Sequence, residues 1–102
     1  MERMLLDPVE VSFAAEVWHW RGPAPFHFVS VPADLADVLG EVAPLVSYGW
    51  GMLPVTVRIG ETRWETAAFP RDGTYVVPLR VAVRRAERID VGDVVDVTVQ
   101  AG

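Results

Sequence analysis

Short stretches of alternating apolar and polar residues, separated by turns that contain Pro or Gly, limit what this chain can fold into. The longest covers residues 10–20, EVSFAAEVWHW, and a period of two is typical of a strand with one buried face. One face would carry Val11, Phe13, Ala15 and Val17, and the other Glu10, Ser12, Glu16, Trp18 and Trp20. The pattern therefore predicts that both indoles point away from the side that holds Phe13.

The same reasoning places further strands and two helices between the turns. Strands are expected at 26–31, 52–59, 63–69, 74–79 and 93–99, and the nearly all-apolar first of these is expected to be buried on both faces. Pro32 favours the first turn of a helix, which Pro44 is expected to end. The buried stripe of this helix would be Leu35, Val38, Leu39 and Val42. A second helix is expected over residues 80–89, with Ala82, Val83, Ala86 and Ile89 facing inward.

Two of the turns are tight. Pro, Asp and Gly make residues 70–73, PRDG, a strong turn signal. The loop between the expected strands 52–59 and 63–69 holds two residues, either 60–61 or 61–62. The second choice is preferred because it avoids placing Arg58 opposite Arg63. Either choice puts Trp64 on the face of Val57. Elements of this size predict a mostly β fold, a small barrel of six to seven strands with two short helices.

Length and composition narrow the class of protein. A chain of 102 residues that is 51% apolar and 23% charged fits one soluble globular domain over residues 1–102. The absence of cysteine excludes a disulfide scaffold and a thiolate metal site. MERMLLDPVE lacks the pattern of a signal peptide, and no apolar run approaches the roughly 20 residues of a membrane helix. We therefore expect a bacterial-type cytoplasmic protein with no membrane partner.

The charge is acidic overall, with one basic segment. A net charge of −5 disfavours binding to a phosphate backbone, so nucleic acid is an improbable partner. Arg80, Arg84 and Arg88 recur at helical spacing on one predicted face, where like charges repel. An anion could offset that repulsion and makes the three a candidate anion site. The chain's 14 acidic residues could also offset it, and a solvated, internally paired helix is the favoured reading.

Several motifs together give the chain a family resemblance. They are AEVWHW at 15–20, PFHFVSVP at 25–32, and the stretch from 55 to 99 with WET, FPRDGTY, a basic helix and GDVVDV. In this combination the sequence resembles the DUF1905 family of small bacterial domains of unknown function. The resemblance implies a double-split β-barrel, also described as a pseudobarrel, and implies neither a reaction nor a ligand. Ala67 stands where the family often has a small polar residue, so no hydroxyl role rests there.

The aromatic residues supply the candidate ligand site. Trp64 is expected in the core, whereas two indoles on a mixed polar face suit a ligand pocket or an interface as well as plain packing. Gly49 and Gly51 flank Trp50, which could lie on a mobile flap or cap the barrel. The candidate cleft is formed by Trp18, Trp20, His27 and Trp50, with Arg58 or Arg71 fixing an acidic group of the ligand.

The histidines are weaker candidates for chemistry. Pairing of two strands could bring His19 and His27 together, but no third ligand is spaced to complete a metal site, so none is assigned. Either could act as an acid or base with Glu16. No serine lies in a nucleophile motif, so we assign neither catalytic residues nor a cofactor.

The functions that remain are ranked by these residue types. A non-catalytic binding module with an aromatic cleft for a small molecule comes first. A protein-interaction module that self-associates through Trp18 and Trp20 comes second. An acid–base enzyme using His19 or His27 is third, and nucleic-acid binding is last. The sequence sets neither the ligand nor the oligomeric state.

Overall fold

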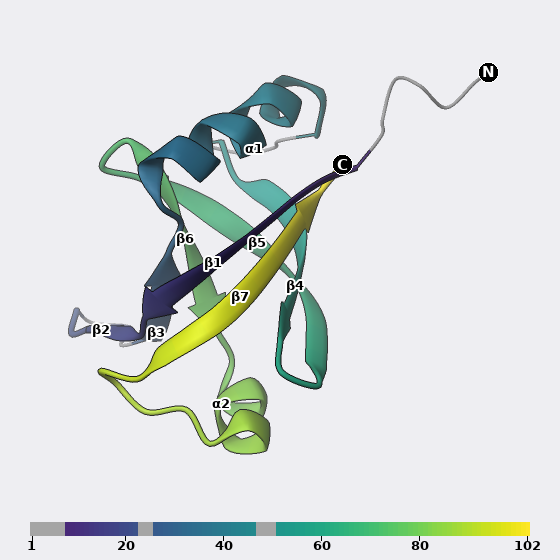
Figure 1. Cartoon of the computed structure of the whole chain (residues 1–102). Helices are drawn as coiled ribbons and strands as arrows, with labels where there is room; N and C mark the ends of the chain where they lie inside the picture. Colours follow the sequence, from purple (N-terminus) through teal and green to yellow (C-terminus); the bar gives the residue numbers. More distant parts are fainter. Residues whose placement is uncertain (1–7, 23–25, 47–50) are drawn as a thin grey trace.

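The computed structural model describes residues 8–22, 26–46 and 51–102 (Figure 1). Seven strands and two helices fill these ranges, which makes the protein mostly β. The strands are β1 (Val9–Glu16), β2 (Trp18–Trp20), β3 (Phe26–Ser30), β4 (Leu53–Ile59), β5 (Thr62–Arg71), β6 (Thr74–Leu79) and β7 (Val94–Ala101). The helices are α1 (Ala33–Val46) and α2 (Val81–Glu87).

All seven strands belong to one antiparallel sheet. Their order is β1-β7-β4-β5-β6-β3-β2. The first and last strands of this order are separated along the chain by a single residue, Val17. The sheet must therefore curl until its two ends come close, and Figure 1 shows the resulting half-barrel, with α1 near one end and α2 near the other. A curled β sheet with two helices is the coarse fold that the sequence predicts.

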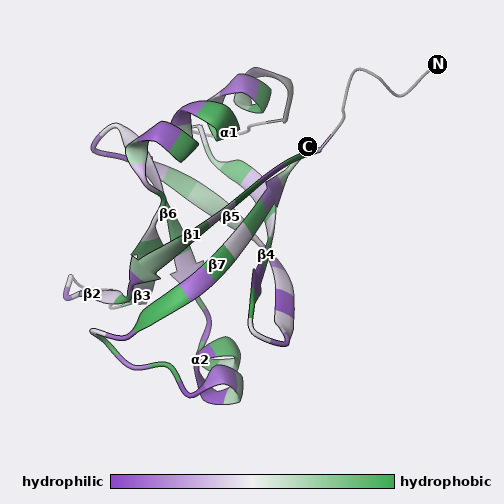
Figure 2. Ribbon diagram, viewed as in Figure 1, coloured by the Kyte–Doolittle hydropathy of each residue, from purple (hydrophilic) through white to green (hydrophobic). Residues whose placement is uncertain are grey.

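The core fills the concave side of this sheet. Alternation places Val55, Val57 and Ile59 of β4 and Val97 and Val99 of β7 inward, each at most 4% exposed. Their neighbours along the strands face water, and purple and green bands alternate along β7 and the β4–β5 hairpin in Figure 2. Leu39 and Ala36 of α1 close the core at one end, and both are buried. The predicted stripe on this helix is thus the side that packs.

Both helices end differently from the sequence prediction. Pro44 lies inside α1 and does not end it. Because Pro44 is exposed and near the last turn, its missing N–H costs the helix one bond, to a carbonyl that lies close to water. The second helix is shorter than 80–89. Arg80 precedes its first turn in an extended conformation, and Arg88 takes a left-handed one, with φ 56°, that turns Ile89 into the core.

The first β-hairpin corrects the preferred register. Ile59 pairs with Thr62 and Arg58 with Arg63, so the two-residue loop is 60–61 and the preference for 61–62 is wrong. Gly60 has φ 59° while residue 61 keeps a negative φ, the pattern of a turn with Gly first. The gain from this glycine outweighs the repulsion between two exposed arginines, since exposed charges interact weakly. Trp64 lies opposite Val57 in the core, as predicted.

Neither helix offers a membrane span. Within the described ranges, no helix is both long and apolar enough to cross a bilayer.

Candidate functional site

The segment between β1 and β2 decides where the two indoles point. Val17 is fully buried, and its backbone is held on both sides: its N–H donates to the Asp93 carbonyl at 2.8 Å and its carbonyl accepts from the Gly92 N–H at 2.8 Å. Trp18 and Trp20 therefore lie on the opposite, convex side of the sheet. Neither belongs to the main core, and Trp20 is 40% exposed. The parity predicted from the sequence is confirmed.

The partner strand adds more aromatic rings to this convex side. Trp18 pairs directly with Phe28, and Trp20 with Phe26. The ring centroids of Trp18 and Phe28 are 5.1 Å apart, and those of Phe26 and Phe28 are 5.6 Å apart. Phe69 of β5 meets Phe28 edge-on at 6.2 Å. Such separations are typical of interacting aromatic pairs.

The rings of Trp20, Phe26, Phe28 and Phe69 line a hollow of about 510 Å³ that is open to solvent, which we call the aromatic cleft. Its lining residues come from β2, β3, β5 and β6: Trp20, Phe26, Phe28, Phe69, Pro70, Arg71, Val76 and Pro78. The volume lies within the range of small-molecule sites, which are concave, mostly apolar and carry few polar groups. Arg71 is the charged residue among them.

The β5–β6 hairpin brings Arg71 to the cleft. Arg71 pairs with Thr74 across a loop of Asp72 and Gly73, both at positive φ of 51° and 79°. Asp-Gly with positive φ at both positions is the combination that a tight hairpin turn of this hand needs. The turn predicted at PRDG is thus present. Because Phe69 and Arg71 are two residues apart on one strand, both side chains face the cleft.

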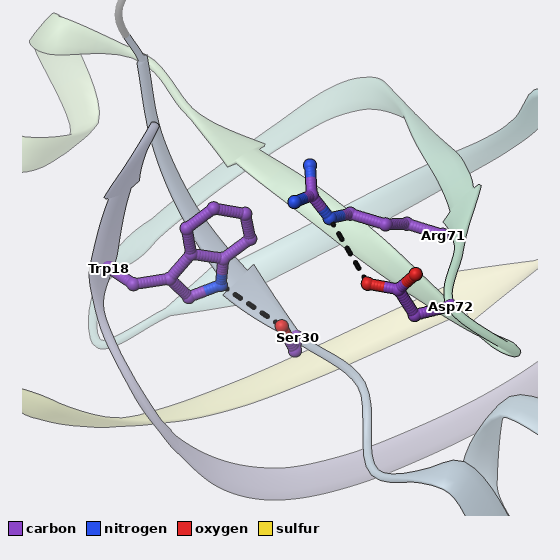
Figure 3. A network of polar contacts seen from close by, with 4 residues as sticks. All are labelled: Trp18, Ser30, Arg71 and Asp72. Carbon is purple, nitrogen blue, oxygen red and sulfur yellow. Dashed lines mark hydrogen bonds and ion pairs between the residues drawn. The ribbon is translucent and has the colours of Figure 1, made fainter. Parts of the chain in front are cut away.

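The Arg71 guanidinium lies near both indoles, and Figure 3 shows it together with Trp18. Its carbon is 5.3 Å from the centre of the Trp18 ring and 5.0 Å from that of Trp20. Its Nε also forms an ion pair with the Asp72 carboxylate at 3.5 Å. The Arg71 side chain is 43% exposed and that of Asp72 86% exposed, so the ion pair is weak. Cation–π contacts hold the guanidinium in place while its outer N–H groups stay within reach of water.

A hydrogen bond fixes one of the two indoles. Trp18 Nε1 donates to Ser30 Oγ at 3.0 Å, across the β2–β3 pair (Figure 3). This bond satisfies the polar atom of a half-buried indole, which would otherwise favour an orientation toward water. Trp18 is thereby held as a platform for Arg71, while Trp20 is the more accessible of the two.

The other predicted cleft residues lie elsewhere. His27 is on the opposite face of β3 from Phe26 and Phe28, so it does not line the aromatic cleft. Arg58 lies on the polar convex face of β4, in a groove with Glu10 and Arg63. Trp50 lies outside the described residues. The structure thus brings together Trp18, Trp20 and Arg71 from the predicted set and separates His27 and Arg58 from them.

The two histidines form a pair of their own. His19 lies directly opposite His27, with ring centroids 4.7 Å apart. Burial, then Arg84 and then His19 lower the pKa of His27 below its usual 6.5, whereas Asp90 acts in the raising direction. Within the described ranges, no group of three His, Asp or Glu residues is arranged to hold a metal ion. Glu16 ends β1, where it pairs with Val94, whereas His19 lies in β2 and pairs with His27, so the pairing does not set the two opposite each other.

The three arginines of the candidate anion site are spread over different structures. Arg80 lies before α2 and donates from Nη2 to the Glu65 carbonyl at 2.8 Å. Arg88 follows α2 in its left-handed conformation, so the three do not share one continuous helix face. Arg84 and Arg88 do border a shallow hollow together with Arg85 and Asp90.

Sequence reasoning missed most of the cleft wall. Phe26, Phe28, Phe69, Val76 and Pro78 were assigned to strands and not to a site. The signal was present, because residues 26–30 carry Phe26 and Phe28 on one face and Val29 on the other, and residues 75–79 are apolar on both faces, so these strands need cover on both sides. The sequence did not predict that β2, β3, β6 and the end of β5 lie next to one another in the sheet. This order places the convex faces of these strands side by side.

The comparisons with known proteins give a family and no activity. A family model described as "Domain of unknown function (DUF1905)" matches residues 13–99, most of the chain. A search of curated proteins found no match.

Proposed function

Since the chain belongs to the DUF1905 family, whose function is unknown, we propose from the site itself that it is a non-catalytic binding module. Its ligand is a small amphipathic molecule with a flat apolar body and an anionic group. The apolar body occupies the aromatic cleft, and the anion contacts Arg71. The observation that carries the proposal is a guanidinium held between two indoles at the edge of an open aromatic hollow.

Apolar exposure supports the first half of this proposal. Trp20 and Phe26 are each 40% exposed and are paired side by side on the hairpin. Two large rings that face water together, above the buried Phe28, are costly for a folded protein unless something covers them. A flat ligand that stacks on these rings would remove that surface from water and gain about 25 cal/mol per Å² of it.

The state of Arg71 supports an anionic group. Two indoles hold the guanidinium, so little conformational freedom is left to lose when an anion binds. The Asp72 carboxylate is its weak, exposed counter-ion and contacts only Nε. A ligand carboxylate or sulfonate can therefore take two N–H donors of the fork at small cost. An aromatic face beside a fixed fork selects a molecule that combines both features.

Two dyes with the same rings test the proposal. 8-Anilinonaphthalene-1-sulfonate is anionic, whereas N-phenyl-1-naphthylamine lacks the sulfonate. We expect the sulfonate to bind the native protein more tightly, by about tenfold if the charged contact is worth about 1.4 kcal/mol. Circular dichroism under the same conditions excludes binding to unfolded protein.

Matched charge removals complete this experiment. Arg71→Gln should abolish the preference for the sulfonate, while Arg58→Gln, which removes the same charge from the polar face, should leave it unchanged. An equal loss of this preference in both variants would mean that the net charge of the protein, and not the position of Arg71, causes it. No binding of either dye to the wild type would reject the cleft as a ligand site.

Self-association is the second candidate, favoured by the same exposed rings of Trp20 and Phe26. A second copy covering the cleft would shield these rings without any small ligand. Light scattering across micromolar concentrations separates the two: a monomer throughout supports the small-molecule proposal, and a dimer weakened by Trp20→Ala supports self-association.

We also propose that the half-barrel closes as a double-split barrel, the form that the DUF1905 resemblance implies. What supports this is the single buried residue, Val17, that connects the two end strands of the sheet. Slow amide exchange along the free edge of β1 would agree with closure. Exchange there as fast as in the turns would speak for an open half-barrel.

A further inference from the structure

The β2–β3 hairpin carries different chemistry on its two faces. Its register holds three cross-strand pairs in a row: Trp18 with Phe28, His19 with His27, and Trp20 with Phe26. Alternation directs the first and third pairs to the side of the aromatic cleft, whose wall includes Trp20, Phe26 and Phe28, and the middle pair to the other face. Any force that separates the two imidazoles therefore acts directly on the wall of the cleft.

The charges that face His27 come from every element packed against it. β2 contributes His19, α2 contributes Arg84, and the turn after α2 contributes Asp90. On β6 its partner is Leu79, which is apolar and buried. Arg84 Nε is buried and has no hydrogen-bond partner among the described residues. Arg84 and His19 thus lower the pKa of His27, whereas the Asp90 carboxylate acts to raise it.

Protonation would turn this arrangement from stable to repulsive. Burial, Arg84 and His19 lower the pKa of His27, so the uncharged form of its ring is favoured at neutral pH, where it lies 4.7 Å from the His19 ring at a tilt of 50°. A proton on His27 places a positive charge next to the Arg84 guanidinium, one of the groups that lower the pKa of His27, and next to the His19 ring 4.7 Å away. The cations His27 and Arg84 repel each other, and Asp90 acts against this repulsion.

The hairpin is built so that it can respond. β2 has three residues, and within the described sheet it pairs only with β3. A short strand at the end of a sheet opens at lower cost than strands in the middle. Its indoles form the platform on which Arg71 lies. Loss of the β2–β3 pairing would therefore disperse both the aromatic wall and the anion contact.

We propose that the His19–His27 pair is a proton switch that keeps the aromatic cleft assembled at neutral pH and loosens it in mild acid. The proposal rests on the proposed function for its purpose, because the switch would control release of the ligand. The coupling between histidine pair and hairpin is a property of the chain itself and can be measured without any ligand.

The first test therefore uses no ligand. The Trp18 indole N–H bonds to Ser30 across the hairpin, so its NMR signal reports the register on the cleft side. We expect this signal to change along the same titration curve as the His27 ring, with a midpoint below pH 6.5. His27→Gln should remove that transition, whereas His19→Gln, which removes a neighbour that lowers the pKa of His27, should raise its midpoint. An indole signal that stays constant while His27 titrates would overturn the switch.

Two charge variants move the midpoint in opposite directions. Arg84→Gln removes a neighbouring cation and should raise the midpoint of both signals, whereas Asp90→Asn removes the opposing carboxylate and should lower it. If the His27 midpoint moves and the Trp18 signal does not follow it, the two faces of the hairpin are independent and the proposal is wrong.

The second test adds the sulfonate dye, which stays anionic throughout the range. We expect its affinity to fall on the order of fivefold when His27 becomes protonated. By linkage, saturating dye should weaken proton binding to His27 by the same factor, which lowers the midpoint of the His27 titration. Constant affinity through this titration would contradict the switch. Failure of the dye to bind at any pH would reject the proposed function instead, and the Trp18 signal would still decide the coupling.

Discussion

The two halves of one sheet differ on their convex faces. On β1, β7, β4 and the start of β5 that face is polar, with Ser12 bonded to Thr98 at 3.0 Å and Arg58 near Glu10. On the end of β5, β6, β3 and β2 it is aromatic, with Phe28 and Val76 buried outside the main core. The concave faces of both halves contribute apolar side chains to the main core, and the second half also carries His19 and His27 on that side. Residues on the second convex face are thus not needed for the main core, which leaves them available for a ligand.

The difference follows from the residues on the convex side of each strand, which alternate with the residues that face the core. A strand with one solvated face alternates, whereas a strand covered on both faces is apolar throughout. On their convex side β3 and β6 carry Phe26, Phe28, Val76 and Pro78, yet the described part of the chain provides no helix over that side (Figure 1). Apolar composition without a cover is therefore the feature that distinguishes the candidate site from the rest of the surface.

The largest expected effect comes from removing a ring from the aromatic half. Phe28→Ala should destabilise the protein by about 3 kcal/mol, since Phe28 is 9% exposed and contacts three other rings. Thr98→Ala on the polar half should cost within about 0.5 kcal/mol. Urea unfolding compares the two, with Phe28→Leu as a milder variant if Ala prevents folding. Equal costs would mean that the aromatic face is not packed.

The two hairpin turns offer a smaller contrast. Gly60 in the polar half and Gly73 in the aromatic half both have positive φ, so replacement by Ala should cost about 1 kcal/mol at each. Gly60→Ala should cost more, because a Cβ there would collide with the Glu87 carboxylate, which accepts a bond from Thr62 at 2.6 Å. The space around Gly73 is open. Thermal unfolding that ranks Gly73→Ala as the more harmful would contradict this geometry.

Trp20 separates binding from stability. Trp20→Ala should lower stability by only about 1 kcal/mol, since the indole is 40% exposed and its main partner is Arg71. Affinity for the sulfonate dye should nevertheless fall about tenfold, as expected for an aromatic anchor. Dye titration and urea unfolding of the same sample test both values. Loss of stability as large as for Phe28→Ala would make Trp20 a core residue.

The smallest effect is a pH dependence confined to the aromatic half. Because the pKa of His27 is lowered in the folded state, the unfolded state binds more protons below pH 6.5. Stability should therefore be greatest above pH 6.5, fall as pH decreases toward the lowered pKa, and level off below it. The difference between wild type and His27→Gln in urea isolates this contribution. A difference that is constant from pH 8 to pH 5 would contradict the lowered pKa.

Local patterns predicted the elements and the direction of side chains well. The alternation of residues 10–20 predicted that Val17 faces inward and Trp18 outward, because a two-residue period fixes faces without knowledge of the neighbours. The Asp-Gly turn placed Arg71 at a hairpin for the same local reason. Pro44 was misread, since a proline near the end of a helix costs one bond and tertiary packing can outweigh it.

Strand pairing was the part that sequence reasoning could not reach. His27 was assigned to the cleft together with Trp18 and Trp20, but the strand pairing puts it opposite His19 on the other face of the hairpin. Arg58 was chosen as an anion ligand for the type of its side chain. The sheet order places its strand, β4, between β7 and β5 and therefore away from the aromatic cleft. Non-local pairing decides which side chains meet, and a pattern along one strand contains no information about it.

The four indole N–H signals of the protein allow the central claim to be tested in one NMR titration with 8-anilinonaphthalene-1-sulfonate. Trp18 and Trp20 border Arg71, while Trp64 lies in the core and is an internal control. We predict that the signals of Trp18 and Trp20 move together and saturably, and that the Trp64 signal stays in place. Movement of Trp64, or of Thr98 on the polar face, with Trp18 and Trp20 unaffected would contradict the aromatic cleft as the binding site.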